Sequence, residues 1–405
     1  MKRLLYLSQW FEPEPTPKGA EFVHAIEQAG YRVKVATGFP NYPGGKVYPG
    51  YRIKPWSRER YRGVNLTRLP LYPSHSSSSI GRIANYLSFF LSALGYGLVR
   101  GHRYDAVYVY HPPITVGAAA ALFCGLWRRP FVLEIQDLWP DSVNETGMTS
   151  PRVVRAIDAL CRFVYARAAV IVTQSAGMRE RLIARGIPAE KLAIIRNWTD
   201  EAAAAPLPAP TAPVAGERFT FFYAGNLGRV QSLETAVDAA LLAHAADPRI
   251  ELVLMGDGVE REALQAAVQA RAQGIVRLLP PVPIHEVAAA TAHADALLIH
   301  LADRPLFEIT IPSKTQFYLA SGKPIVAGLG GEAAELIRAS GAGLVAPPEN
   351  ARALADIMLD MAGKSMAERD AMAARGRSFY TEHLSFARGI REILAVLDRV
   401  MPRRG

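Results

Sequence analysis

The stretch that decides the fold is "FEITIPSKTQFYLASGKPIVAGLGGEAAELI", residues 307–337. It puts Glu308 and Lys314 six residues apart, with a proline between them, and a pair of glycines follows. The pattern predicts a loop carrying Glu308, a helix that begins near Pro312 and ends at Gly322, the strand "KPIVAGL", and a second helix opened by the glycine pair. A ligand of such a strand–turn–helix unit binds at the carboxyl ends of a parallel sheet.

The first turn of the helix predicted after residue 312 is a candidate anion site. Ser313 and Lys314 lie there, where free backbone N–H groups and the helix dipole attract negative charge and the lysine adds a full positive charge. The helix predicted to start at Gly331 would bring a second such turn into the same cleft, and the pair would suit a diphosphate. Glu308 is better placed to accept hydrogen bonds from sugar or ribose hydroxyls. On spacing alone, a solvated ion pair between Glu308 and Lys314 is an equally good interpretation.

Two more glycine loops follow candidate strands of the same half, "YAGNLGRVQSLE" at 223–234 and "LMGDGVE" at 254–260. A single Gly-x-Gly is weak evidence, but three glycine loops after strands of one domain indicate a nucleotide.

The rest of the chain repeats the alternation of short apolar runs and helical patterns. Such runs extend from "RLLYLSQ" to "VIVTQS" in the first half and from "FTFFYAG" to "GLVAP" in the second. They predict an α/β protein with two doubly wound, Rossmann-like domains that face each other across a cleft. The Ala- and Pro-rich "TDEAAAAPLPAPTAP" predicts a connector. The predicted boundaries are 1–198 and 218–380 for the domains, 199–217 for the linker, and 381–405 for a terminal helix that could pack back on the first domain.

Length and composition agree with a globular protein of two domains. A chain of 405 residues exceeds what one hydrophobic core usually serves, and half of its residues are apolar while 20% are charged. The two cysteines, Cys124 and Cys161, fall in predicted helices, which argues against a disulfide framework and indicates a reducing compartment. The apolar run after Met1 is too short for a signal peptide.

One segment of the first half is strongly basic. Between residues 50 and 104, nine cations stand against one acid, Glu59, so this segment carries +8 of the net charge of +9. Within it, residues 77–104 combine apolar side chains at helical spacing with flanking arginines, and polar residues interrupt the run. We expect this stretch to lie on an anionic membrane surface without spanning the bilayer. An ordinary packed helix is the alternative, and a nucleic-acid partner is not expected because no binding motif accompanies the charge.

The order of motifs in the second half resembles the donor-binding half of retaining glycosyltransferases of family 4, which have the GT-B fold. The motifs are "YAGNLG", "GDG", "LLPPVP", "FEITIPSKTQFYLASGKPIVA" and "GGEAAELI". In the first half, "FEPEPTPKGAEFVHAIEQAGYRVKVATGFPNYPGG" and "FVLEIQDLWPDS" resemble the branch that assembles lipid-linked surface polysaccharides such as O-antigen or capsule. The resemblance implies transfer of a hexosyl or N-acetylhexosaminyl group from a UDP-sugar to a polyprenyl-diphosphate-linked acceptor. It places this reaction on the cytoplasmic face of the bacterial inner membrane.

The resemblance also assigns the donor site. Such enzymes hold the nucleotide-sugar with two glutamates separated by seven residues; Glu308 is the first, but Phe317 stands where the related pattern has the second. An arginine and a lysine that many members carry after the first strand of this domain are replaced here by Asn226 and Gln231. The catalytic residues implied for the donor half are Lys314, Arg229 and Glu308. The implied donor contacts are Asn226, Gln231, Gly256, Asp257, Gly258, Val282, Ser313, Gly331 and Glu332, the last as a substitute for the missing glutamate.

In the first half, the resemblance places Lys18 and Gly19 in a loop near the donor phosphates, and Gln136 and Asp137 after a later strand, near the sugar. His111 ends the strand "AVYVYHP" and also points toward the predicted cleft. A lone histidine at a strand end is more often structural than catalytic. Asp137 is therefore the preferred catalytic candidate, with a loop-closing carboxylate as the alternative interpretation.

No cofactor is expected beyond the donor substrate. The sequence has no Asp-x-Asp and no His/Cys/Glu cluster with ligand spacing, which predicts a metal-independent reaction. Two other classes fit the two-domain plan. A UDP-sugar 2-epimerase would need no acceptor, and a sugar-binding scaffold protein that has lost activity is kept open by the missing second glutamate.

Overall fold

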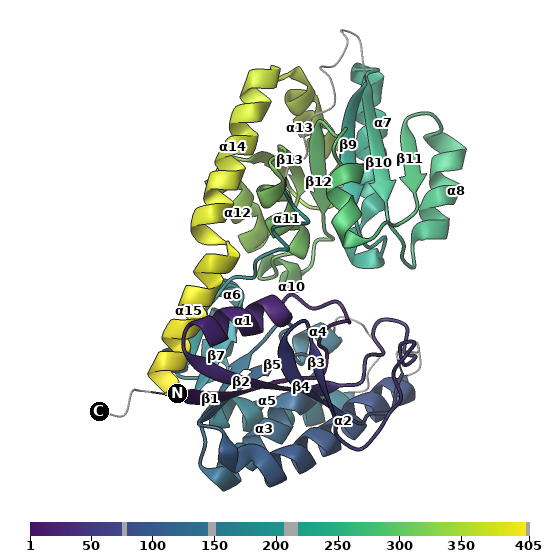
Figure 1. Ribbon diagram of the computed structural model, residues 1–405. Coiled ribbons are helices and arrows are strands. Elements are labelled where there is room, and N and C mark those ends of the chain that lie inside the picture. The colour runs from purple at the N-terminus through teal and green to yellow at the C-terminus, as the bar shows by residue number, and fades with distance from the viewer. Residues whose placement is uncertain (75–78, 145–150, 206–217, 402–405) are drawn as a thin grey trace. The chain divides into compact units, whose positions relative to one another are not determined.

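A computed structural model describes residues 1–74, 79–144, 151–205 and 218–401 (Figure 1). The chain forms two compact units. The first comprises residues 1–196 together with the chain from residue 389 onward, and the second comprises residues 197–388. The second unit is therefore inserted into the first, because the chain leaves the first unit and later returns to it.

The first unit is built on an eight-stranded sheet. Only the pair β3–β4 is antiparallel among its described strands. In pairing order the strands are β3 (Ser57–Tyr61), β4 (Val64–Leu69), β2 (Tyr31–Gly38), β1 (Lys2–Ser8), β5 (Ala106–Tyr110), β6 (Phe131–Glu134), β7 (Val170–Thr173) and β8 (Leu192–Ile194). The helices that accompany them are α1 (Ala20–Gln28), α2 (Ser79–Arg100), α3 (Ile114–Trp127), α4 (Asp141–Asn144), α5 (Pro151–Arg167), α6 (Ala176–Ala184) and α15 (Phe386–Val400).

The second unit has a parallel six-stranded sheet. Its order is β11 (Val276–Leu279), β10 (Ile250–Met255), β9 (Phe219–Ala224), β12 (Ala296–His300), β13 (Ile325–Gly328) and β14 (Gly343–Ala346). The helices are α7 (Leu233–Ala246), α8 (Arg261–Arg271), α9 (Val287–Ala290), α10 (Pro305–Glu308), α11 (Ser313–Ser321), α12 (Gly331–Ser340), α13 (Ala351–Gly363) and α14 (Met366–His383). One apolar core packs α7 and α13 against the sheet, and another packs α11 and α12. The strand order reverses between β9 and β12, which is where such sheets bind ligands.

Three strands of the first unit are absent from the prediction. β3 reads "SRERY" and alternates charged with half-buried residues at the edge of the sheet, so it lacks an apolar run. β4, which pairs with β3, was not predicted either, and β8 was missed because it has only three residues. In the second unit, all six predicted strands are present, because each is a short and largely apolar run.

Two predicted boundary segments differ from the structure. The start of the predicted linker is packed, since Ala203 and Ala204 are 6% and 1% exposed and belong to the second unit's core. Small apolar side chains can fill a core as readily as they can line a flexible connector. The rest of that linker lies outside the described residues from position 206 to position 217. The predicted terminal helix, 381–405, covers the last residues of α14 and all of α15, and the chain from Gly389 onward belongs to the first unit.

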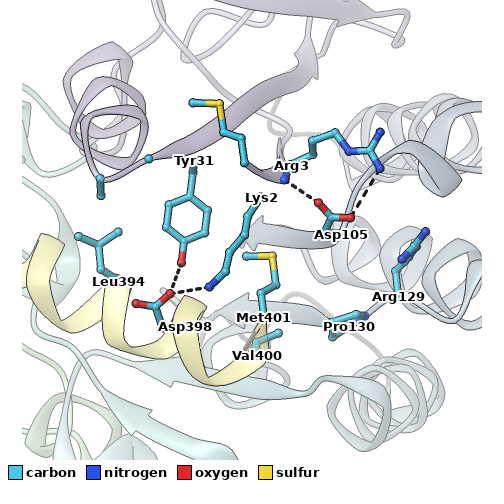
Figure 2. A pocket seen from close by; sticks show the side chains of 13 residues that line it. Lys2, Arg3, Tyr31, Asp105, Arg129, Pro130, Leu394, Asp398, Val400 and Met401 are labelled. Carbon is cyan, nitrogen blue, oxygen red and sulfur yellow. Dashed lines mark hydrogen bonds and ion pairs between the residues drawn. The ribbon is translucent and has the colours of Figure 1, made fainter. Parts of the chain in front are cut away.

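The last turns of α15 are held to the amino ends of β1 and β2. Asp398 Oδ1 accepts hydrogen bonds from Lys2 Nζ at 2.7 Å and from Tyr31 OH at 2.8 Å (Figure 2). A cavity of about 1000 Å³ lies at this end of the sheet. Ligands of parallel sheets bind at the opposite, carboxyl ends of the strands, so this cavity is not the candidate active site.

None of the helices in the described ranges is both long and apolar enough to cross a membrane.

Candidate active site

A cavity of about 550 Å³ lies at the carboxyl ends of strands in the second unit. It is bordered by the residues that follow β9, β10 and β11 and by the first turns of α11. Six of the predicted donor-site residues line it, namely Asn226, Gly256, Asp257, Val282, Ser313 and Lys314. The segment with most of the predicted chemistry therefore forms one pocket near the point where the strand order reverses.

Lys314 supplies the positive charge of this pocket. Its Nζ lies 4.6 Å from the centre of the Tyr223 ring, and within the described ranges it has no hydrogen-bond or ion-pair partner. Burial lowers the pKa of Lys314 to about 8. No side chain caps the start of α11, so the first backbone N–H groups of this helix are also available. A half-buried cation without a carboxylate, next to an uncapped helix start, is suited to bind an anion.

Gly256 allows the loops after β9 and β10 to approach each other under the cavity. Its φ is +151°, and a Cβ atom at this position would lie 1.8 Å from the carbonyl oxygen of Gly225. Leu227 N also donates to Asp257 O at 2.8 Å, which ties the two loops together. Gly256 and Asp257 border the cavity, whereas Gly258 is not among its described lining residues. These glycines shape the pocket through close backbone packing.

Arg229 and Gln231 do not line the cavity, contrary to the prediction. Arg229 Nε lies 3.1 Å from Glu260 Oε1, and the arginine side chain is 85% exposed. Gln231 Oε1 accepts hydrogen bonds from Gly228 N at 3.1 Å and from Asn226 Nδ2 at 3.3 Å. Arg229 is thus neutralised by a nearby acid, and Gln231 closes its own loop.

The second predicted helix start also lies outside the described lining of this cavity. Gly331 begins α12 with a φ of +58°, and a Cβ atom there would lie 1.9 Å from the carbonyl oxygen of Glu308. The glycine therefore lets the end of α10 pack against α12. Glu308 is the last residue of α10, not a loop residue, and it is exposed. Neither Glu308 nor Gly331 nor Glu332 lines the pocket that contains Lys314.

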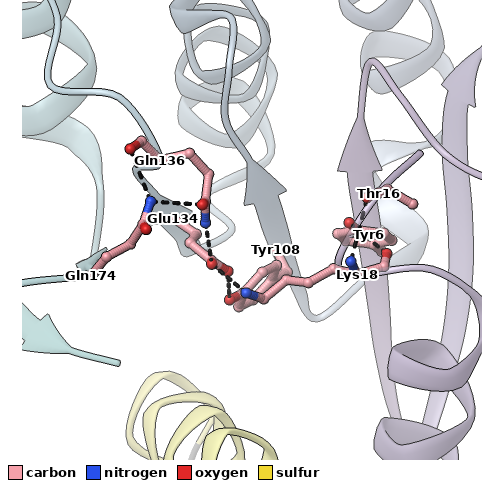
Figure 3. A network of polar contacts seen from close by, with 7 residues as sticks. All are labelled: Tyr6, Thr16, Lys18, Tyr108, Glu134, Gln136 and Gln174. Carbon is pink, nitrogen blue, oxygen red and sulfur yellow. Dashed lines mark hydrogen bonds and ion pairs between the residues drawn. The ribbon is translucent and has the colours of Figure 1, made fainter. Parts of the chain in front are cut away.

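In the first unit, Lys18 is part of a buried polar network and not of an open phosphate loop (Figure 3). Its Nζ lies 2.5 Å from Glu134 Oε1, and both side chains are 1% exposed. Tyr108 OH also donates to Glu134, and Gln136 Nε2 does so at 2.7 Å. Gln174 Nε2 in turn donates to Gln136 Oε1 at 2.6 Å. The network joins residues at the carboxyl ends of β6 and β7 to the loop after β1, and it holds Gln136 in place.

The other first-unit candidates lie at helix starts and strand ends. Gly19 precedes α1, whose first amide, Ala20 N, donates to Glu12 Oε1 at 3.3 Å, so a carboxylate of the protein occupies that helix start. His111 is fully buried, and neither ring nitrogen has a hydrogen-bond partner among the residues that the structure describes. Burial lowers its pKa to about 3, so its ring is neutral. The side chain of Asp137 reaches solvent, but protein atoms surround part of its carboxyl group, and this desolvation raises its pKa. Contact with water limits the increase. Asp137 is the accessible acid of this set.

Three residues that matter here were not predicted. Glu134 was treated only as part of a strand, yet it is the carboxylate that binds Lys18. Thr199 was assigned to the linker, yet it lines the cavity with Lys314. Ile284 borders the same cavity and is 60% exposed. An acid in an apolar strand was a visible signal for Glu134, whereas the sequence held no signal for Thr199.

Within the described residues, no group of three or more His, Cys, Asp or Glu side chains is placed to hold a metal ion.

Two α/β units with mainly parallel sheets in one chain, one of them with a lysine-lined pocket where its strand order reverses, are typical of the GT-B class of glycosyltransferases. Family models match both units. Residues 20–198 match the glycosyl transferase 4-like domain, and residues 218–364 match the glycosyl transferases group 1 domain. The chain belongs to the glycosyltransferase family that combines these two domains, and it is a glycosyltransferase.

Relatives and solved structures agree with this family. WcaI of Escherichia coli, named as a colanic acid biosynthesis glycosyl transferase, is 26% identical over 345 residues, which are 80% of this chain and 82% of WcaI. WbjE of Pseudomonas aeruginosa, named as a glycosyltransferase, is 26% identical over 284 residues, 65% of this chain and 69% of WbjE.

The fold matches solved structures at low sequence identity. The structure of HepE from Anabaena in complex with UDP has a TM-score of 0.71 at 15% identity, over 98% of this chain and 100% of that one. A UDP-forming α,α-trehalose-phosphate synthase from Burkholderia vietnamiensis has a TM-score of 0.72 at 16% identity, over 98% and 100% of the two chains. At these identities the likeness establishes the GT-B fold.

Proposed function

We propose that this glycosyltransferase transfers a hexosyl or N-acetylhexosaminyl group from a UDP-sugar to a polyprenyl-diphosphate-linked acceptor in bacterial surface polysaccharide synthesis. The observation that carries the proposal is the pocket with Lys314, a cation without a described acidic partner at an uncapped helix start. The UDP complex of HepE and the role named for WcaI in colanic acid biosynthesis support the nucleotide and the pathway class.

In the proposed reaction, charge stabilisation by the donor pocket does most of the catalytic work. The acceptor hydroxyl oxygen bonds to the anomeric carbon while the bond from that carbon to the β-phosphate oxygen breaks, and the hydroxyl proton passes to the departing phosphate. Lys314 and the N–H groups at the start of α11 stabilise the charge that develops on that phosphate. The acceptor attacks the anomeric carbon on the same face from which the phosphate departs. This geometry retains the anomeric configuration and requires no nucleophile from the protein. The reaction needs no metal ion in this scheme.

An exposed apolar face on the first unit supports a peripheral position at the cytoplasmic surface of the membrane. α2 exposes apolar side chains at a helical spacing of three, four and seven residues, and α3, which packs against it, exposes more near its end. These residues are Ile80, Ile83, Leu87, Leu91 and Leu98 of α2 and Leu122, Leu126 and Trp127 of α3. We call them the α2–α3 face. Arginines at positions 82, 100, 103, 128 and 129 lie on or beside the two helices, which suits anionic lipid headgroups.

The first experiment measures ligand binding and turnover. Thermal unfolding with UDP-, GDP- and dTDP-sugars should show the largest stabilisation by a UDP-sugar, because only a ligand that binds the folded state raises its midpoint. With that donor, membranes that contain lipid-linked acceptor should release UDP, and excess EDTA should not reduce the rate. Binding of the UDP-sugar without UDP release would indicate a sugar-binding scaffold protein. Interconversion of free UDP-sugars without acceptor would indicate an epimerase. Loss of activity in EDTA would refute the metal-independent scheme.

A further inference from the structure

The segment that opens the second unit forms part of the wall of the Lys314 cavity. Thr199 lines the cavity together with Gly225 and Lys314. A few residues on, Ala203 and Ala204 are buried in the same core as the cavity residues Phe317 and Tyr318. The segment is therefore a fixed part of this unit, and Thr199 is held where a ligand in the cavity would meet it.

The backbone of Thr199 is fixed by a short chain of hydrogen bonds. Thr199 N donates to Tyr380 OH at 3.2 Å, and Tyr380 OH donates to Glu201 Oε1 at 3.0 Å. Glu201 Oε1 also accepts from Phe386 N, at the start of α15, at 2.8 Å. Tyr380 lies on α14 and is 4% exposed, so solvent does not compete for its hydroxyl. The ring of Trp198 packs edge-on against that of Phe386, with centroids 5.3 Å apart, beside these bonds.

The hydroxyl of Thr199 is left for a ligand. Within the described ranges the amide of Thr199 donates to the Tyr380 hydroxyl, and the side-chain oxygen Oγ1 of Thr199 makes no hydrogen bond. A half-buried hydroxyl in a cavity with a cation is able to donate to a phosphate or sugar oxygen. We propose that Thr199 contacts the nucleotide-sugar and that Tyr380 and Glu201 are positioning residues that hold it there. This inference rests on the proposed function, because it takes the Lys314 cavity as the donor site.

The test compares donor binding by matched variants of the full chain. Thr199→Val removes the ligand-facing hydroxyl, Tyr380→Phe removes the hydroxyl that anchors the Thr199 amide, and Glu201→Gln keeps an acceptor oxygen for both of its donors. Tyr96→Phe is the control, because it removes one buried hydroxyl, bonded to Tyr104 OH at 2.8 Å, from the other unit. The readouts are the Kd for UDP and the UDP-sugar by calorimetry, the donor KM and kcat, and the thermal midpoint.

Thr199→Val and Tyr380→Phe should each raise the donor Kd and KM about three- to tenfold, the effect of one hydrogen bond, with a smaller change in kcat. Tyr96→Phe should bind the donor as the unchanged protein does. Glu201→Gln should raise the donor Kd, but less than Tyr380→Phe does, because its amide oxygen is a weaker acceptor for Tyr380 OH than the carboxylate. The inference is overturned if Thr199→Val and Tyr380→Phe keep the original donor affinity, or if Tyr380→Phe weakens binding only as much as Tyr96→Phe. A failure of the unchanged protein to bind any UDP ligand would instead refute the proposed function.

Discussion

Lys314 should make the proposed donor pocket sensitive to pH. Its pKa of about 8 means that the ammonium form dominates at lower pH and the neutral amine at higher pH. The kcat/KM for the donor, which reports on the free enzyme, should therefore fall as the pH rises through about 8. Lys314→Arg should abolish this fall, because a guanidinium stays charged throughout that range. Rate profiles from pH 6 to 10 measure both.

Removing the charge of Lys314 tests its role directly. Lys314→Met should lower kcat on the order of 10²- to 10³-fold, as expected for loss of a group that stabilises developing negative charge. Lys364→Met is the matched control, since Lys364 ends α13 and its Nζ lies 2.9 Å from Asp360 on the surface. A Lys314→Met variant with more than about a tenth of the original kcat would contradict the assignment.

At the level of single residues, sequence positions alone could not separate available cations from neutralised ones. Arg229 and Lys314 look alike in the sequence, but Glu260, 31 residues away from Arg229, pairs with the arginine. Lys18 is paired with Glu134, which is 116 positions distant. Partners so far away in the chain are set by tertiary structure. The pocket residues near Lys314 were predictable because they follow consecutive strands, whose carboxyl ends meet at one edge of the sheet.

At the level of elements, α2 and α3 present the α2–α3 face and predict binding to lipid. The double variant Leu87→Glu/Leu91→Glu should bind phosphatidylglycerol vesicles at least about tenfold more weakly in co-sedimentation. Full burial of one leucine side chain contributes roughly 1.5–3 kcal/mol, and about 1.4 kcal/mol corresponds to a tenfold change in affinity. High salt should also release the protein, because headgroup attraction is screened. Leu242→Glu on α7 replaces a single exposed leucine of the second unit and should change nothing. Equal sedimentation of both variants would rule out this face.

The elements themselves were predictable where burial imposed a pattern. Strands β9 to β14 are largely apolar runs of four to six residues, and each was found from its apolar sequence. β3 and β4 were missed because charged and polar residues interrupt their apolar pattern. β3 is the edge strand, and Arg68 of β4 bonds Glu59 of β3 across the antiparallel pair at 2.9 Å. The helix starts were placed within one residue at α11 and α12, because proline and glycine mark them.

At the level of the whole molecule, the returning helix should stabilise the first unit. Ile393 and Leu397 of α15 are 0% exposed, so Ile393→Ala or Leu397→Ala should lower the free energy of unfolding of that unit by about 2–5 kcal/mol. Asp398→Asn should cost less than about 1 kcal/mol, because the carboxylate is largely exposed. Denaturant titration followed by a probe in each unit measures this. UDP affinity should stay constant in all three variants below their transitions, and a loss of UDP affinity would contradict a purely structural role.

The chain enters the second unit at Asn197 and leaves it after Arg388. Close to these two points, the rings of Trp198 and Phe386 pack edge-on, with centroids 5.3 Å apart. When the two ends of an inserted domain lie close together, another domain can replace it without distorting the rest of the chain. An exchange at these points would replace the second unit, the proposed donor module, and keep the first unit. Chimaeras cut at these aromatic neighbours offer a direct route to new donor preferences.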